Sequence, residues 1–200
     1  MRITSIGIIA VALLAFTGAA NAELALDFTP PESSGTNASW SLGWTFVVNT
    51  TITVTSLEYW DGPITQNHDV GIYDSSGNLL TSATITPSDP LVGSAPWREE
   101  TITPITLTAG QTYVIMGETG TDIYAWDPAS YSTIPQITYG EAAYNLSNTL
   151  AFPNIYDDKV VGGFGPSFNI PEPSFFGYLL AFGAIGLGAL GRARMRASRG

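Results

Sequence analysis

The sequence predicts an all-β protein in which one domain lies between two apolar ends. Short runs rich in β-branched and aromatic residues, separated by turn residues, follow one another from Trp40 to Phe168, and helical periodicity is absent there. About 150 residues remain once the apolar ends are set aside, which suits one domain with its own core. We therefore expect a single antiparallel, jelly-roll-like β-sandwich over residues 23–170.

The N-terminal end, residues 1–22, is predicted to be a removable signal peptide. Arg2 precedes the apolar stretch 6–16, and Ala20-Asn21-Ala22 is the small-x-small pattern that a signal peptidase accepts. The apolar stretch is short for a bilayer-spanning helix, so an uncleaved anchor is the weaker alternative. We expect export, with cleavage between Ala22 and Glu23.

The C-terminal end carries a candidate membrane helix followed by basic residues. Nineteen uncharged residues separate Glu172 from Arg192. At about 1.5 Å per residue, this length just crosses a hydrocarbon core of about 30 Å. The basic residues that follow are Arg192, Arg194, Arg196 and Arg199. Because positive charges favour the cytoplasmic side, we expect a transmembrane helix over 174–191, a cytoplasmic tail over 192–200 and the β domain outside.

Pro171-Glu172-Pro173, the Gly-rich apolar helix and the arginine cluster together resemble the PEP-CTERM sorting signal. The resemblance implies that residues 171–200 are read by exosortase, a membrane protease-transpeptidase of Gram-negative bacteria that make extracellular polysaccharide. It assigns the recognition motif to Pro171, Glu172 and Pro173, and the stop to Arg192, Arg194 and Arg196. Ile170 replaces the commoner valine, and Ala193 and Met195 interrupt the basic run. An ordinary C-terminal membrane anchor is the alternative.

The sorting signal implies a route for the protein. An inner-membrane-anchored precursor would be processed and would end at the cell surface or outside the cell, in contact with exopolysaccharide. The prolines on both sides of Glu172 forbid helix and keep the motif extended, which is the shape in which processing enzymes hold a backbone.

Seven runs between the two ends are predicted strands: residues 40–48, 52–60, 69–73, 79–84, 101–107, 112–116 and 122–126. In the second run apolar and polar residues alternate, and the phase slips before Leu57 and Tyr59, which predicts a β-bulge. Residues 74–78 and Ala109-Gly110 are predicted turns, the first with Gly77 at positive φ. The oxygens of 74–78 could also hold calcium, but the full ligand spacing of a calcium loop is missing, so the turn is preferred.

Four segments of the domain resemble an uncharacterised β-sandwich family that is often found ahead of PEP-CTERM tails. They are residues 42–46, 68–74, 107–110 and 164–168. That family has no assigned activity, so the resemblance implies a fold and leaves the ligand open.

The composition of the domain argues against several functions. Residues 23–170 hold sixteen acidic side chains against Arg98 and Lys159, and such a surface repels nucleic acid. The absence of cysteine removes disulfides, thiolate-held metals and a lipid-modified cysteine. His68 is the single histidine, so a histidine-rich zinc site is excluded and a Ser-His-Asp triad would depend on it alone. We interpret His68 as a hydrogen-bonded residue at a sheet edge and expect no metal and no cofactor.

Two residue classes could still contact a glycan. Paired carboxylates could hydrolyse one, but sixteen acids always supply candidate pairs, and the adjacent Glu99 and Glu100 should point to opposite faces of a strand. Aromatic rings could stack on sugars. Trp44 is expected in the core, whereas the following three stand beside turn signals and are open to either role: Trp60, Trp97 and Trp126.

Three functions follow from these observations, in decreasing order of support. The first is a non-enzymatic, exported surface or extracellular-matrix protein associated with exopolysaccharide or biofilm. The second is a carbohydrate-binding module, which is compatible with the first. The third is a glycan-active enzyme.

The exported chain is predicted to start at Glu23, because the small-x-small junction follows directly on the apolar core. N-terminal sequencing of the exported protein should read Glu23-Leu24-Ala25. A chain that still carries residues 6–16 would show that this segment is an anchor.

Overall fold

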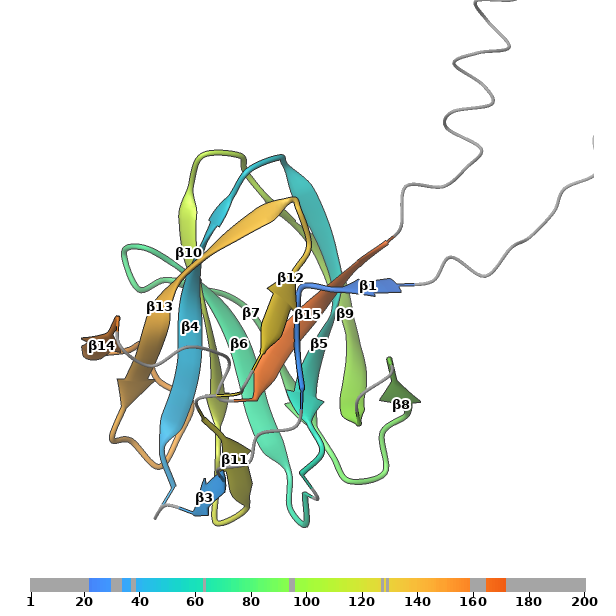
Figure 1. Ribbon diagram of the computed structural model, residues 1–200, viewed down its shortest axis with the longest axis vertical. Coiled ribbons are helices and arrows are strands. Elements are labelled where there is room, and N and C mark those ends of the chain that lie inside the picture. The colour runs from blue at the N-terminus through green and yellow to red at the C-terminus, as the bar shows by residue number, and fades with distance from the viewer. Residues whose placement is uncertain are drawn as a thin grey trace, which may run out of the picture.

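The structure, a computed structural model, describes residues 22–29, 34–36, 39–62, 64–93, 96–126, 128, 130–158 and 165–171. Every regular element in these ranges is a β-strand (Figure 1). Of the expected signal peptide and sorting tail, only Ala22 and Pro171 fall inside the described ranges. Within them, no helix has the length and apolar character needed to cross a membrane.

Two larger antiparallel sheets and two short strand pairs make up the fold. The five-stranded sheet has the order β1 (Ala22–Leu24), β15 (Pro166–Pro171), β5 (Ile52–Trp60), β9 (Trp97–Leu107) and β8 (Leu91–Val92). The six-stranded sheet has the order β14 (Ile155–Asp157), β13 (Ile137–Asn145), β4 (Ser41–Val48), β10 (Thr112–Glu118), β6 (His68–Asp74) and β7 (Leu79–Ile85). The short pairs are β3 (Ser34–Thr36) with β11 (Ile123–Ala125), and β2 (Leu26–Phe28) with β12 (Tyr131–Thr133). The predicted all-β, antiparallel, sandwich-type class is confirmed.

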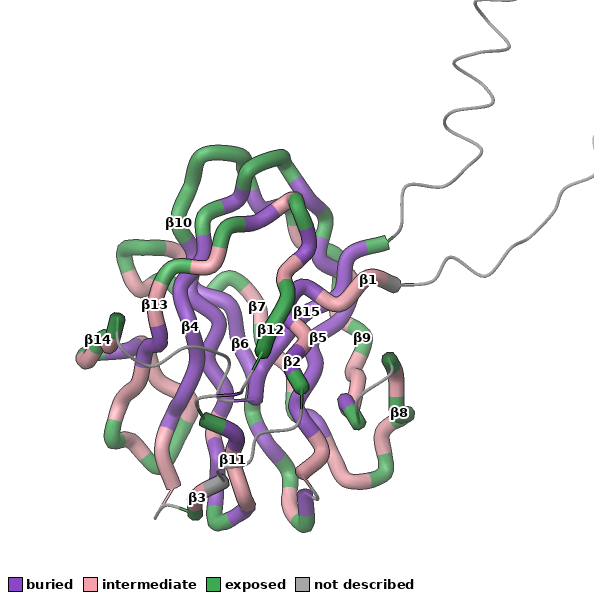
Figure 2. Tube along the Cα trace, in the orientation of Figure 1, coloured by how far each residue is buried: buried purple, intermediate pink, exposed green. Residues whose placement is uncertain are grey.

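The two larger sheets meet across an aromatic core. Phe168 of β15 lies against Trp44 and Phe46 of β4, with ring centroids 6.2 and 5.2 Å apart. The indole nitrogen of Trp44 donates to the Pro166 carbonyl at 2.8 Å, so burial of the ring leaves no donor unpaired. Figure 2 shows the buried stretches along β4, β5 and β6, with exposed residues at the loops that join them. The expected core position of Trp44 is confirmed.

Local features of the predicted strands and turns are also confirmed. The pairing of β5 with β9 shifts register between Val54 and Ser56, which is the predicted bulge. Gly77 has a φ of 86° and Gly110 a φ of 78°. Inside the first turn, the Asp74 carboxylate accepts hydrogen bonds from the backbone N–H groups of Ser76 and Asn78, which is how a turn satisfies this side chain.

Two long elements, β13 and β15, are not predicted by the sequence pattern. In β13 a register shift between Tyr139 and Ala142 breaks the alternation that identifies a strand. In β15 a proline stands at each end, and prolines weaken a strand pattern. Both strands pair with strands that are predicted correctly, β4 and β5.

Candidate functional site

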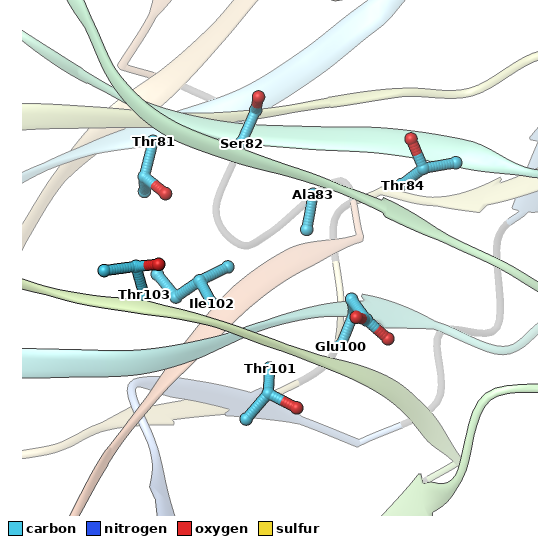
Figure 3. Close-up of a pocket in the computed structure, with 8 residues that line it drawn as sticks. All are labelled: Thr81, Ser82, Ala83, Thr84, Glu100, Thr101, Ile102 and Thr103. Carbon is cyan, nitrogen blue, oxygen red and sulfur yellow. The ribbon is translucent and has the colours of Figure 1, made fainter.

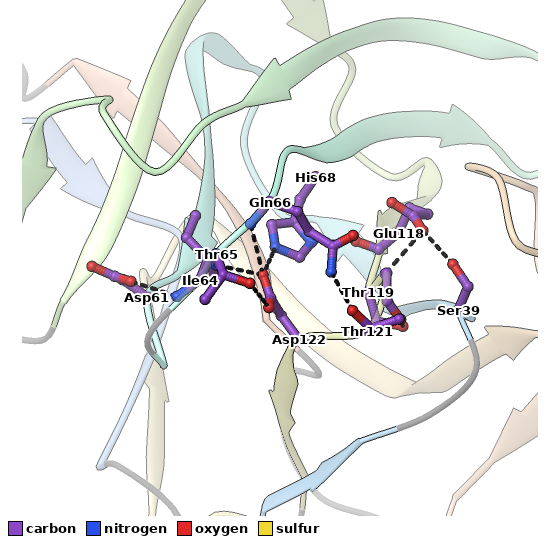
Figure 4. Close-up of polar contacts among 11 residues, drawn as sticks. Ser39, Asp61, Ile64, Thr65, Gln66, His68, Glu118, Thr119, Thr121 and Asp122 are labelled. Atoms are coloured by element: carbon purple, nitrogen blue, oxygen red, sulfur yellow. Dashed lines mark hydrogen bonds and ion pairs between the residues drawn. The ribbon is translucent and has the colours of Figure 1, made fainter.

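A polar network surrounds His68, the first residue of β6 (Figure 4). Nδ1 donates to the Glu118 carbonyl at 2.8 Å, and Nε2 lies 3.1 Å from Oδ2 of Asp122. The imidazole stacks on the Tyr59 ring, with centroids 4.2 Å apart and planes 4° from parallel. The side chain is fully buried, so both ring nitrogens and one ring face are engaged inside the protein.

His68 is hydrogen-bonded, as expected, but the expected position at a sheet edge is wrong. β6 lies between β10 and β7 in the six-stranded sheet. The adjacent Asp69 points to the opposite face of β6, where it is exposed and accepts a hydrogen bond from Thr84 at 2.6 Å. The acidic partner of His68 is instead Asp122, from the loop between β10 and β11, and no local pattern marks this pairing.

Asp122 holds two loops together. Its carboxylate accepts hydrogen bonds from the backbone N–H groups of Thr65 (2.6 Å) and Gln66 (3.1 Å) and from the Thr65 hydroxyl (2.5 Å). Burial of Asp122 favours a higher pKa, but these hydrogen bonds and the one from His68 outweigh it, so the pKa lies below its ordinary value. A charged Asp122 therefore ties the loop after β5 and the loop after β10 to the start of β6.

Neighbouring contacts extend this network to other loops. Glu118 accepts a hydrogen bond from the Ser39 hydroxyl at 2.6 Å, which fixes the chain just before β4. Arg98 of β9 pairs with Asp61 at 2.8 Å and donates to the Asp89 carbonyl at 2.7 Å. Because the central imidazole is enclosed, this arrangement positions loops at one end of the sandwich.

An open hollow of about 350 Å³ lies between β7 and β9 (Figure 3). Residues 81–84 and 100–103 line it, and most of them contribute hydroxyl groups. Glu100 adds a carboxylate, while Ala83 and Ile102 are the apolar members. Hydroxyl and carboxylate oxygens can hydrogen-bond to sugar hydroxyls, but no aromatic ring is among the residues that line this hollow.

Glu99 and Glu100 point to opposite faces of β9, as predicted. Glu100 lines the hollow, whereas Glu99 accepts a hydrogen bond from the Ser56 hydroxyl of β5 at 2.6 Å. Glu58 of β5, which no local pattern singles out, stands directly opposite Glu99 and contacts the same hydroxyl. Only the strand register brings these two carboxyl groups together.

The structure contradicts two of the three proposed sugar-stacking positions. Trp60 and Trp97 are only 7% and 0% exposed. Both rings pack on Phe28 of β2, at 5.8 and 5.2 Å, and the Trp97 indole donates to Asp27 at 3.0 Å. A segment distant in sequence covers them, so the turn residues beside them gave no indication of burial. Trp126 is 40% exposed and remains a candidate.

The predicted signal-peptidase site and the start of the predicted sorting motif meet at one sheet edge. Ala22 and Glu23 of β1 stand opposite Pro171 and Ile170 of β15 in an antiparallel pair. The remaining predicted sorting residues lie outside the described ranges: Glu172, Pro173, Arg192, Arg194, Arg196 and Arg199.

The fold and these contacts define an antiparallel β-sandwich domain. The chain belongs to the family described as a domain of unknown function, DUF4082, whose model matches residues 27–159. No curated protein and no solved structure matches the chain. The matched range includes the His68 network and leaves out β1 and β15.

Replacing Asp122 with asparagine is predicted to destabilise the full-length chain by about 1–3 kcal/mol at pH 7, because a charged acceptor of several hydrogen bonds is lost. The pKa of Asp122 is lowered in the folded protein. Its contribution is therefore present above the unfolded value of about 3.9 and is lost as the pH falls through the folded value. The difference in unfolding free energy between wild type and Asp122→Asn should shrink from pH 7 to pH 3 in urea titrations.

Asp69→Asn is the matched control, because Asp69 is exposed and has a single hydroxyl donor. It should change the unfolding free energy by less than about 0.5 kcal/mol. A destabilisation by Asp122→Asn that is equal at both pH values would contradict a role for its charge.

Proposed function

We propose that the chain is an exported surface or extracellular-matrix protein that is sorted through residues 171–200 and associates with exopolysaccharide. The pairing of β1 with β15 carries this proposal. The Ala22–Glu23 bond, where we expect the signal peptidase to cut, and Pro171, where the expected sorting motif starts, lie side by side at one edge of the five-stranded sheet (Figure 1). Removal of residues 1–22 and of tail residues beyond Pro171 would leave the strands from β2 to β15 covalently intact.

The domain between these sites suits a structural or binding role. The chain crosses between the two larger sheets from β4 to β5, from β5 to β6, from β7 to β8 and from β9 to β10. This alternation supports a jelly-roll-like sandwich, the arrangement that we propose for the domain. The excess of acidic residues would keep such a passenger soluble and away from nucleic acid.

Carbohydrate binding is the second candidate function. It is favoured by the exposed Trp126 ring and by the hydroxyl-lined hollow between β7 and β9. An exposed aromatic ring can stack on a sugar ring, and protein hydroxyl groups can hydrogen-bond to the sugar hydroxyls.

Replacing Pro171-Glu172-Pro173 with alanines is predicted to leave export intact and to trap the protein in the inner membrane. Apolar length and flanking arginines suffice to stop transfer, whereas the motif is what the processing enzyme would read. The measurement is fractionation of cells with an active exosortase, followed by mass determination of each species. Pro171→Ala alone is the control, because Pro171 is the last residue of β15 and this variant shows the effect of changing the strand without removing the whole motif. If wild type also stays full length in the membrane, the tail is a plain anchor and the sorting proposal fails.

Trp126→Ala is predicted to abolish any binding of the host exopolysaccharide, because Trp126 is the one remaining stacking candidate among the three. The measurement is isothermal titration calorimetry of each folded variant with sugar to millimolar concentration, which does not depend on the Trp126 ring as a reporter. Tyr156→Ala, which removes a ring that is 44% exposed on β14, is the matched control and should bind as wild type does. The absence of any response from folded wild-type protein would remove the carbohydrate-binding candidate.

A further inference from the structure

Four polar side chains gather on one face of the five-stranded sheet, away from the aromatic core. Glu58 of β5 stands opposite Glu99 of β9, and Ser56 of β5 stands opposite Asn169 of β15. Side chains directly opposite in an antiparallel pair have Cβ atoms about 4.5–5.5 Å apart. The four side chains therefore form one cluster across three neighbouring strands.

The cluster has more oxygen acceptors than hydrogens to satisfy them. The Ser56 hydroxyl lies 2.7 Å from Oε1 of Glu58 and 2.6 Å from Oε1 of Glu99, but it carries a single hydrogen. Asn169 uses its amide nitrogen to donate to Glu99 at 3.2 Å. Two further oxygens, Oε2 of Glu58 and Oδ1 of Asn169, are buried and have no hydrogen-bond partner. These side chains are 0% and 2% exposed, so bulk water does not compensate them.

No basic side chain in the described part of the chain neutralises these carboxyl groups. Arg98 is the sole lysine or arginine in the described ranges, and it is engaged by Asp61 and by the Asp89 carbonyl. Burial raises the pKa of Glu58, and the charge of Glu99 raises it further, against the opposing hydrogen bond from Ser56. An uncompensated buried carboxylate is costly, so the cluster requires either a proton or a bound cation.

We propose that Glu58, Glu99, Ser56 and Asn169 bind one Ca²⁺ ion. Calcium takes 6–8 oxygen ligands at about 2.3–2.6 Å, and two bidentate carboxylates with the amide and hydroxyl oxygens would supply about six. The Ser56 hydroxyl lies 2.7 Å from Oε1 of Glu58 and 2.6 Å from Oε1 of Glu99. These two carboxyl oxygens are therefore close enough to each other to bind the same ion. Glu99 is partly exposed, which provides an entry path and room for a water ligand. Mg²⁺ fits less well, because it keeps several waters that a buried cluster cannot hold.

Bound calcium would join β15 to β5 and β9. The cross-strand pair Trp60 and Trp97 lies two residues further along the same strands and on the same face as Glu58 and Glu99. Their fluorescence therefore reports on the ion. This inference does not depend on the proposed sorting route, so either can fail without the other.

The test is thermal unfolding of the full-length chain in a nonionic detergent at pH 7.5, after removal of metals by a chelator. CaCl₂ is then titrated to about 10 mM, since extracellular calcium modules bind with Kd values of about 10⁻⁴–10⁻³ M. We expect a concentration-dependent rise in Tm of about 2–5 °C at 10 mM CaCl₂, read by tryptophan fluorescence. MgCl₂ at the same concentrations should give a smaller rise. Bound Tb³⁺ should show luminescence sensitised by the tryptophans. Added Ca²⁺ should displace the Tb³⁺ and remove this luminescence.

Variants decide whether this cluster is the site. Glu58→Gln should abolish the calcium response, whereas Glu100→Gln, on the opposite face of β9, should keep it. If Glu58→Gln does not fold, Asn169→Ala replaces it, with the same expected loss. Four results overturn the proposal. The first is the absence of any calcium-dependent shift in wild type, as when Glu58 simply holds a proton. The others are an equal shift for both cations, an unchanged shift in the cluster variants, and an equal loss in Glu100→Gln.

Discussion

The packing of Phe168 against Trp44 and Phe46 is the contact on which the rest of the structure depends. This contact brings the last strand, β15, against the core of both larger sheets. Burial of the ring stabilises the fold by about 1.5–3 kcal/mol, and each favourable aromatic pair adds about 0.5–1.5 kcal/mol. Once Phe168 points inward, its neighbour Asn169 must point outward. The same strand therefore contributes Phe168 to the core and Asn169 to the polar cluster around Glu58. At Pro171 it pairs with the N-terminal strand β1.

The bulge in β5 determines which groups lie on each side of that strand. Because the register shifts between Val54 and Ser56, Val54 and Leu57 both reach the core although three positions separate them. Beyond the bulge, Tyr59 points inward and stacks on His68, while Glu58 faces Glu99 on the other side. One irregular residue thus separates the histidine network from the carboxyl cluster.

Local chemistry explains which features could be predicted from the sequence. Gly77 indicates a turn because few other residues adopt its φ, and the phase slip before Leu57 is visible in the order of side chains. The burial of Trp60 could not be predicted, because Phe28 comes from a distant part of the chain. The pairing of His68 with Asp122 depends on loop positions for the same reason, and that of Glu58 with Glu99 on strand register.

The two buried acidic centres show how an acid-rich chain with few basic residues handles carboxyl groups. Asp122 receives hydrogen bonds from backbone and side-chain donors of Thr65, Gln66 and His68, and these hold it in the charged form. Glu58 has only one shared hydroxyl, and its second oxygen has no donor. Loops can turn several N–H groups toward one carboxylate, whereas the N–H groups of β5 are already used by the sheet. A carboxyl group on an inner strand must therefore be compensated from elsewhere, by a cation or a proton, whereas donors from the loops and from His68 already compensate Asp122.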